Sequence, residues 1–402
     1  MRSELLLTLD FPPMGGGIAR WMAELARRYP AGELVVSTAR AEAGGVPAAS
    51  APGSRATDES LGGAVVDRLD VAPRRLRSLP GLIRWSYRAS WLVSRYHPSF
   101  VWCGQLRPAA YPANWLHRLR GVPYGILLHG GDLLTLGRNI NRSRVKRRVA
   151  KALVGGAAVL VANSEYTASL ASEVVRDLTL ERPEGWIRVV PLGTDPDRFR
   201  PGIDAEPFRI RHGLPEGRWL LTVARLVPHK GVDVVLRAMA ALRQRFPDLR
   251  YAVVGHGSYR DDLVTLRARL GLTDRVFFLA DVVDDELPAC YNLADVYVGV
   301  SRRAGADVEG FGISLVEASA SGKPVIAGTG GGMAGAVRDG ETGLLIDGED
   351  PHAVAEAVRG LLENPARARG LGLAGREWVE RFYNWERVVS DLRAISEPLG
   401  RR

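Results

Sequence analysis

The chain has 402 residues, a net charge of +9 at pH 7 and 46% apolar residues. This length suits two domains better than one core, and the apolar content is that of an ordinary globular protein. No apolar run approaches the ~18 residues of a membrane-spanning helix. The only cysteines, Cys103 and Cys290, give no basis for a disulfide framework. We therefore expect a cytoplasmic protein of two domains.

The positive charge lies in the first half of the chain. Residues 1–185 carry 25 basic and 15 acidic residues, whereas residues 186–402 carry 29 and 30. Within residues 71–164, sixteen basic residues accompany a single acid, Asp132. Such a region favours an anionic partner, with an anionic membrane surface and a nucleic acid as the alternatives.

Strand-like and helix-like segments alternate in the first half. The expected strands are 4–9, 34–37, 65–69, 100–102, 125–128, 158–162 and 187–191, and the expected helices are 18–29, 81–96, 112–119, 142–153 and 164–176. This rhythm predicts an α/β domain with a parallel, doubly wound sheet that binds ligands at the carboxyl ends of its strands. Residues 40–57, rich in Ala, Gly, Pro and Ser, predict a loop.

Two glycine-rich turns of this half are candidate ligand sites. Gly15-Gly16-Gly17 follows the first strand and opens the first helix, so its backbone can approach a ligand closely, although a plain tight turn fits equally well. His129 follows the strand 125–128 and precedes Gly130-Gly131, where such sheets carry functional groups. A histidine that bonds only to the loop backbone is the alternative.

The segment 191–201 predicts a connector between domains. Asp195-Pro196-Asp197 is similar to a metal-binding pair of aspartates, but Pro196 and the following Pro201 are typical of a linker. We therefore expect no metal site, and domains at residues 1–192 and 203–377.

The second half repeats the rhythm, with expected strands at 219–224, 251–254, 276–279, 296–300, 324–327 and 344–346 and helices such as 232–245 and 260–270. Arg225 follows its first strand and Lys230 precedes the next helix, an arrangement that suits a diphosphate, although a solvated loop fits too. Gly255-His256-Gly257 lacks the third glycine and the later acid of a dinucleotide fingerprint, which argues against a nucleotide-dependent oxidoreductase.

Two glutamates eight positions apart, Glu309 and Glu317, enclose the uncharged stretch Gly310-Phe311-Gly312-Ile313-Ser314. We expect Glu309 in a loop and Glu317 one to two turns into a short helix. The helix N-terminus then lies between two acids, where an anion can bind backbone N–H groups while the carboxylates accept hydrogen bonds from sugar hydroxyls. A glycine turn with two surface acids is the alternative.

These motifs resemble those of the family 4 retaining glycosyltransferases, which have the two-domain GT-B fold. The resemblance spans nearly the whole chain through the motifs at 191–195, 223–231, 254–257, 308–317 and 340–345. The stretches 307–310 and 9–13 are similar to those of bacterial phosphatidylinositol mannoside mannosyltransferases. Where the family usually has a proline and a glutamate after Gly331-Gly332, this chain has Met333-Ala334-Gly335.

The resemblance implies two Rossmann-like domains facing a cleft, with a C-terminal helix at about 378–402 packing on the first domain. The implied catalytic residues are His129, Arg225, Lys230 and Glu309. The implied donor-binding residues are Gly16, Gly17, Gly255, Val282, Gly310, Phe311, Gly312, Ile313, Ser314 and Glu317, with no cofactor and no metal.

The implied activity is retaining transfer of a hexosyl group, with mannosyl from GDP-mannose as the expectation, to a lipid-linked or other glycan acceptor. Residues 73–97 interleave arginines with Leu79, Leu82, Trp85, Trp91 and Tyr96, which predicts peripheral docking on the anionic inner leaflet. Aromatic residues that belong to the core, with arginines that solvate the outer faces of helices, are the alternative. The alternatives are a UDP-glucose donor with a soluble acceptor, or a nucleic-acid-binding protein without transferase activity.

Overall fold

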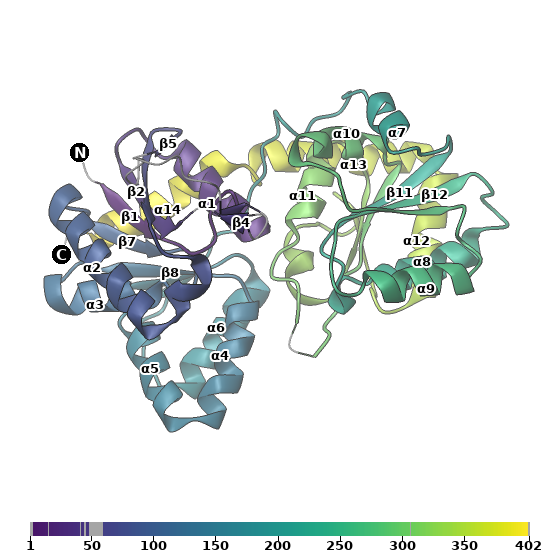
Figure 1. Ribbon diagram of the computed structural model, residues 1–402. Coiled ribbons are helices and arrows are strands. Elements are labelled where there is room, and N and C mark those ends of the chain that lie inside the picture. The colour runs from purple at the N-terminus through teal and green to yellow at the C-terminus, as the bar shows by residue number, and fades with distance from the viewer. Residues whose placement is uncertain are drawn as a thin grey trace. The chain divides into compact units, whose positions relative to one another are not determined.

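The computed structural model describes residues 3–14, 16–40, 42–43, 46–47, 59–305 and 307–400. The chain forms two compact units, one of Met1–Val190 with Trp385–Arg402 and one of Pro191–Asn384 (Figure 1). The polypeptide therefore passes between the units twice, at 190/191 and at 384/385. Most of the segment 40–57, which the sequence predicts to be a loop, lies outside the described residues.

The first unit is built on an eight-stranded sheet with the order β10-β9-β8-β7-β1-β2-β6-β5. Its strand pairs are parallel except for the antiparallel pair β5–β6. The strands are β1 (Glu4–Leu7), β2 (Leu34–Ala39), β5 (Glu59–Leu61), β6 (Ala64–Leu69), β7 (Phe100–Cys103), β8 (Tyr124–Leu128), β9 (Val159–Ala162) and β10 (Ile187–Val189), and β3 (Glu42–Ala43) pairs separately with β4 (Val46–Pro47).

Helices pack on this sheet and enclose an apolar core that includes Trp85 and Tyr124. Serine side chains cap three of them, since Ser78 accepts from Gly81 N, Ser143 from Lys146 N and Ser164 from Thr167 N. The helices are α1 (Gly17–Arg28), α2 (Leu79–Tyr96), α3 (Ala110–Arg120), α4 (Gly131–Arg142), α5 (Arg144–Gly155), α6 (Glu165–Asp177) and α14 (Trp385–Leu399), with a 3-10 turn η1 (Pro73–Arg77).

The second unit has a six-stranded, all-parallel sheet with the order β13-β12-β11-β14-β15-β16. Its strands are β11 (Arg218–Val223), β12 (Leu249–Val254), β13 (Val276–Leu279), β14 (Val296–Gly299), β15 (Val325–Gly328) and β16 (Leu344–Ile346). Its helices are α7 (Glu206–Arg211), α8 (Val232–Leu242), α9 (Arg260–Arg269), α10 (Leu287–Leu293), α11 (Ile313–Ala320), α12 (Pro351–Glu363) and α13 (Pro365–Arg381), with 3-10 turns η2 (Pro228–Lys230), η3 (Asp284–Glu286) and η4 (Gly331–Gly335). The two parallel, doubly wound sheets confirm the predicted fold class.

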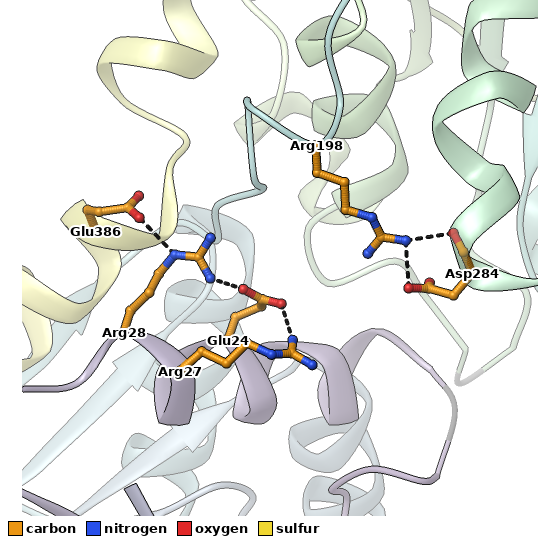
Figure 2. A network of polar contacts seen from close by, with 6 residues as sticks. All are labelled: Glu24, Arg27, Arg28, Arg198, Asp284 and Glu386. Carbon is orange, nitrogen blue, oxygen red and sulfur yellow. Dashed lines mark hydrogen bonds and ion pairs between the residues drawn. The ribbon is translucent and has the colours of Figure 1, made fainter. Parts of the chain in front are cut away.

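The last helix, α14, belongs to the first unit, as the predicted architecture requires. Ser396 on α14 donates to the buried carboxylate of Glu4 at 2.5 Å. At the other end of α14, Glu386 accepts from Arg28 Nε at 2.8 Å, and Arg28 also pairs with Glu24 on α1 (Figure 2). Burial raises the pKa of Glu4, although the hydrogen bonds from Ser396, Tyr29 and Trp102 oppose this shift.

The C-terminal helix, expected at about 378–402, begins later in the structure, after a break in the helical chain. The structure ends α13 at Arg381 and begins α14 at Trp385. Between them, the carbonyl of Tyr383 accepts from Thr194 N at 2.8 Å, and Asn384 forms a β-bridge with Thr194. The N–H of Tyr383 still donates to Val379 as in a helix, but its carbonyl bonds to the connector, and α13 ends here.

Candidate functional site

The second sheet has one point where the strand order reverses. Strands β11 to β13 run to one side and β14 to β16 to the other, so the loops after β11 and β14 diverge at the carboxyl edge. Ligands of open α/β sheets bind at this position. The loop after β11 carries Arg225 and Lys230, and the loop after β14 carries Glu309.

Lys230 and Glu309 form an ion pair between these two loops. Their side chains are only 16% and 20% exposed, so the pair is largely withdrawn from solvent. Burial by itself would raise the pKa of Glu309, but the charge and hydrogen bond of Lys230, with help from His229 and Arg225, hold that pKa below its usual value. A cation of the kind that binds phosphate and a carboxylate of the kind that accepts from hydroxyls thus lie side by side.

Arg225 and His229 flank this pair. Arg225 is exposed, and no residue in the described part of the chain hydrogen-bonds to or pairs with its guanidinium. The His229 ring is 6% exposed, and its Nδ1 has no partner among the described residues. Burial and the charge of Lys230 lower the pKa of His229. No local motif marks His229 in the sequence, because its position beside Glu309 depends on contacts between segments distant in sequence.

Helix α11 begins where the glutamate spacing predicts. Gly312 precedes it with φ +102°, a conformation that favours glycine, and no side chain caps this N-terminus. Ile313 and Ser314 therefore begin the helix, and Gly310 and Phe311 lie buried before it. Glu317 is 2% exposed and accepts from the Tyr291 hydroxyl at 2.6 Å, so the surface-acid alternative is wrong for this glutamate.

Close approaches of neighbouring loops explain two further glycines. Gly255 has φ +132°, and a Cβ there would lie 2.1 Å from the carbonyl oxygen of Ala224. Gly231 has φ +70°, and a Cβ there would lie 2.2 Å from the carbonyl oxygen of Val300. A larger residue at either position would push the loop that carries Arg225 and Lys230 away from a neighbouring loop or strand.

Val282 is partly exposed after β13. The next part of its loop is tied to the connector, because Arg198 Nη2 donates to the carbonyl and the carboxylate of Asp284, both at 2.6 Å (Figure 2). Asp195 in the connector accepts from the N–H groups of Asp197 and Arg198, which is the hydrogen bonding of a turn. In the described part of the chain, no group of three or more His, Cys, Asp or Glu residues has the geometry to hold a metal.

The first sheet reverses its order between β1 and β7. Gly16 and Gly17 follow β1; Gly16 has φ +116° and precedes α1 without a side-chain cap, while Gly15 lies outside the described residues. His129 follows β8, and its Nε2 lies 2.6 Å from the carbonyl oxygen of Gly104. Because a carbonyl only accepts, Nε2 carries the proton. The rings of His129 and Trp21 form a T-shaped contact with 5.1 Å between centroids. The backbone-bonded alternative for His129 is therefore present in the structure, without excluding a role for Nδ1.

Other polar groups at this edge were missed by the sequence reasoning. The hydroxyl of Thr8 donates to Gln105 at 3.1 Å, yet Gln105 Nε2 and Asn163 Oδ1 have no partner among the described residues. Both side chains are at least nine-tenths buried. Burial raises the pKa of Asp10, although the charges of His129 and Arg77 oppose the shift. The common signal is a polar residue one to three positions after a buried strand.

The basic region 73–97 forms an amphipathic surface that differs in part from the prediction. Trp85 is fully buried, and its Nε1 donates to Ser37, so its expected place at a membrane surface is wrong. The apolar residues that α2 exposes recur every four positions and are here called the α2 stripe: Leu79 (72% exposed), Ile83 (49%), Tyr87 (68%) and Trp91 (48%). Arg88 lies over the Trp91 ring, 4.1 Å from its centroid. Throughout the described residues, no helix is long and apolar enough to cross a bilayer.

Comparison with known proteins identifies the family. Residues 15–198 match the profile of "Glycosyltransferase Family 4" and residues 204–378 that of "Glycosyl transferases group 1". The chain is 36% identical to the GDP-mannose-dependent alpha-(1-6)-phosphatidylinositol monomannoside mannosyltransferase of Mycobacterium tuberculosis, over 98% of this chain and 97% of that one. It is 31% identical to the D-inositol 3-phosphate glycosyltransferase of Streptomyces avermitilis, over 93% and 81% of the two chains.

Among solved structures, sucrose-phosphate synthase from Thermosynechococcus elongatus superposes with a TM-score of 0.79 over 99% of both chains at 23% identity, a likeness of fold. The two family matches and the full-length relative show a glycosyltransferase, so the alternative of a protein without transferase activity is wrong. The chain belongs to the family 4 glycosyltransferases of the GT-B fold and is a hexosyltransferase.

Proposed function

We propose that the protein transfers a mannosyl group from GDP-mannose, with retention of anomeric configuration, to a hydroxyl of a phosphatidylinositol mannoside. One observation carries the chemistry, namely the pairing of Lys230 with Glu309 at the reversal point of the second sheet. The choice of donor and acceptor rests on the full-length similarity to a relative named for them.

Each site residue has a part in this proposal. Arg225, Lys230 and the N-terminus of α11 at Gly312–Ser314 stabilise the charge that builds on the leaving diphosphate, and one such donor is worth ~10²–10³ in rate. Glu309 accepts from hydroxyls of the transferred sugar, and Glu317 accepts from the ribose diol. Gly255 and Val282 contribute backbone around the nucleotide, whereas His129 and the Gly16–Gly17 turn serve the transferred sugar and the acceptor.

The reaction breaks the bond between C1 of the sugar and the diphosphate oxygen. The acceptor oxygen forms the new bond to C1 on the same face, and its proton goes to the leaving phosphate. The charge on the diphosphate is thus compensated by this chain's own cations, and we propose that no metal is needed.

The function is tested by thermal unfolding with GDP-mannose, UDP-glucose and the free nucleotides, followed by transfer to phosphatidylinositol monomannoside. At one hundred times its Kd, GDP-mannose should add ~2.7 kcal/mol to the free energy of unfolding. Transfer should persist in EDTA. Stabilisation by UDP-glucose alone would contradict the donor, and loss of transfer restored by Mg²⁺ or Mn²⁺ would contradict metal independence.

The similarity to a D-inositol 3-phosphate glycosyltransferase favours a second candidate function, in which the acceptor is soluble and belongs to the inositol phosphates. The α2 stripe favours the lipid-linked acceptor, because Arg74, Arg75 and Arg77 lie exposed just before it. Amphipathic ring side chains suit the headgroup boundary and arginines suit anionic lipid. We therefore propose that the first unit docks on the inner leaflet of the plasma membrane.

Sedimentation with liposomes of anionic phospholipid distinguishes the two acceptors. Binding should weaken at 0.5 M salt and fall by ~100-fold when Arg74, Arg75 and Arg77 become serine, because each basic group near such a surface is worth ~1 kcal/mol. Ile83→Asp should weaken binding at both salt concentrations. Arg243, Arg367 and Arg369 are exposed on the second unit, and their replacement by serine is the matched control. Failure to pellet at low salt would leave the soluble acceptor as the better candidate.

A further inference from the structure

We propose that Tyr383 is a positioning residue for Glu309 and acts through the glycine-rich turn η4, Gly331–Gly335. The inference rests on the proposed function in one respect, the assignment of Glu309 to the sugar of the donor. Tyr383 lies between α13 and α14, 74 positions after Glu309. No motif of the sequence links the two residues, so the connection comes from contacts alone.

Tyr383 contacts the donor-site loops in two places. Its side chain is buried at 5% exposure, and its hydroxyl donates to the carbonyl of Gly335, the last residue of η4. Its ring also packs edge-on against Phe311, with 5.8 Å between centroids. Phe311 lies two residues after Glu309, so Tyr383 contacts both the loop that carries the glutamate and the turn η4.

The turn η4 also holds the backbone of Glu309 in place. Gly332 N donates to the carbonyl of Glu309 at 2.8 Å. Gly331 has φ +68° and approaches so closely that a Cβ there would lie 2.6 Å from the same carbonyl oxygen. Met333 is 2% exposed, and its Cε lies 3.7 Å from the point where Gly312 would carry a Cβ. A shift of η4 therefore shifts the backbone that carries the Glu309 carboxylate.

The backbone of η4 is rich in glycine and needs contacts with other segments to keep one conformation. Apart from Met333, the turn consists of three glycines and one alanine, so its backbone has unusual freedom. The Tyr383 hydroxyl limits that freedom at one end and the Gly332 hydrogen bond at the other. Gly335 itself is exposed, so water can replace the hydroxyl at its carbonyl and the fold tolerates the loss.

Tyr383→Phe tests the proposal because it removes the hydroxyl and keeps the ring. We expect a loss of about five-fold in kcat/KM for the intact sugar donor. The Kd of the free nucleoside diphosphate should not change, because Glu309 serves the sugar and Glu317 the nucleoside. A general loosening of the unit would weaken both measurements, and the proposal would then be wrong.

The matched control is Tyr259→Phe, in the same unit, since no described residue hydrogen-bonds to the Tyr259 hydroxyl. It should leave both measurements unchanged. Gly331→Ala tests the proposal by displacing η4 itself. The alanine Cβ would be strained at this positive φ and would collide with the Glu309 carbonyl, so the variant should displace the glutamate and reproduce the selective loss. This variant keeps the proposal testable even if Tyr383→Phe folds poorly.

A double-mutant cycle with Glu309→Gln completes the test. If Tyr383 acts through Glu309, Tyr383→Phe should cause no further loss in the Glu309→Gln background. Additive losses, or full activity of Tyr383→Phe, would overturn the positioning role while leaving the proposed function intact. If Glu309→Gln itself does not reduce sugar transfer, the proposed role of Glu309 is the part that fails.

Discussion

Replacing Lys230 or Arg225 with alanine should lower turnover by ~10²-fold or more while the fold stays intact. Both cations lie on the loop after β11, at the reversal point of the sheet, where a diphosphate would bind. Negative charge builds on the leaving diphosphate as the sugar–phosphate bond breaks. A positive charge there therefore stabilises the transition state more than it stabilises the intact bound donor. The effect should therefore appear in kcat as well as in kcat/KM for the donor.

The Lys230→Ala variant should also change the pH profile. In the unaltered protein the Lys230 charge overcomes the effect of burial and keeps the pKa of Glu309 below its usual value. Without Lys230 the burial remains, so the pKa rises and the carboxylate is protonated at higher pH. The acidic limb of kcat/KM should then move to higher pH.

The control for these two variants is Arg245→Ala, which removes an exposed arginine of the same unit that pairs with Glu363. A surface pair of this kind contributes ~0–1 kcal/mol, so turnover should not change. Near-normal turnover in both Lys230→Ala and Arg225→Ala would remove the diphosphate assignment. Equal melting temperatures of all three variants would show that a loss of turnover comes from the site and not from a less stable fold.

The two glutamates should divide the donor between them. Glu317→Gln should weaken binding of free GDP by ~10-fold, because an amide cannot accept the charge-assisted hydrogen bonds of a ribose diol as a carboxylate does. Glu309→Gln should leave GDP binding unchanged and lower kcat/KM for GDP-mannose by a similar factor. Titration calorimetry with GDP and steady-state kinetics with GDP-mannose measure the two effects.

The buried contact of Glu317 with Tyr291 calls for a separate control. Tyr291→Phe removes that hydrogen bond and leaves the Glu317 carboxylate in place. It therefore shows how much of the loss in Glu317→Gln comes from the broken contact with Tyr291 and how much from the missing carboxylate. If Glu309→Gln and Glu317→Gln both bind GDP like the unaltered protein, the division of the donor between the glutamates is wrong. A loss of GDP binding in Glu309→Gln alone would reverse the assignment.

The sequence by itself determined the architecture and most of the second unit's candidate site. Buried apolar runs separated by amphipathic segments predict parallel strands and crossover helices, and each predicted strand was found within about two residues of its place. Residues that follow a parallel strand must lie at one edge of the sheet, whatever the details of packing. The positions of Arg225, Lys230 and Glu309 at that edge therefore follow from local patterns.

Local sequence patterns did not predict the structure correctly where a short segment is compatible with two conformations or with two buried faces. Helix α4 was not predicted, because it begins at Gly131 and its first turn depends on Asp132, whose carboxylate accepts from the N–H groups of His129 and Leu133. The interleaving of Trp85 and Trp91 with arginines predicts that both tryptophans lie at a membrane surface, with a place in the core as the alternative. Which face of α2 turns inward depends on the sheet beneath it, and the structure buries Trp85 and exposes the α2 stripe.

Only the tertiary structure decided the contacts that join distant segments. Lys230 and Glu309 are 79 positions apart, and their pairing requires the strand order that places β14 beside β11. The hydrogen bond of Tyr383 to Gly335 likewise requires the end of α13 to return to η4. Periodicity reports which face of a segment is apolar, whereas the partner of that face is chosen by packing among segments of the whole chain.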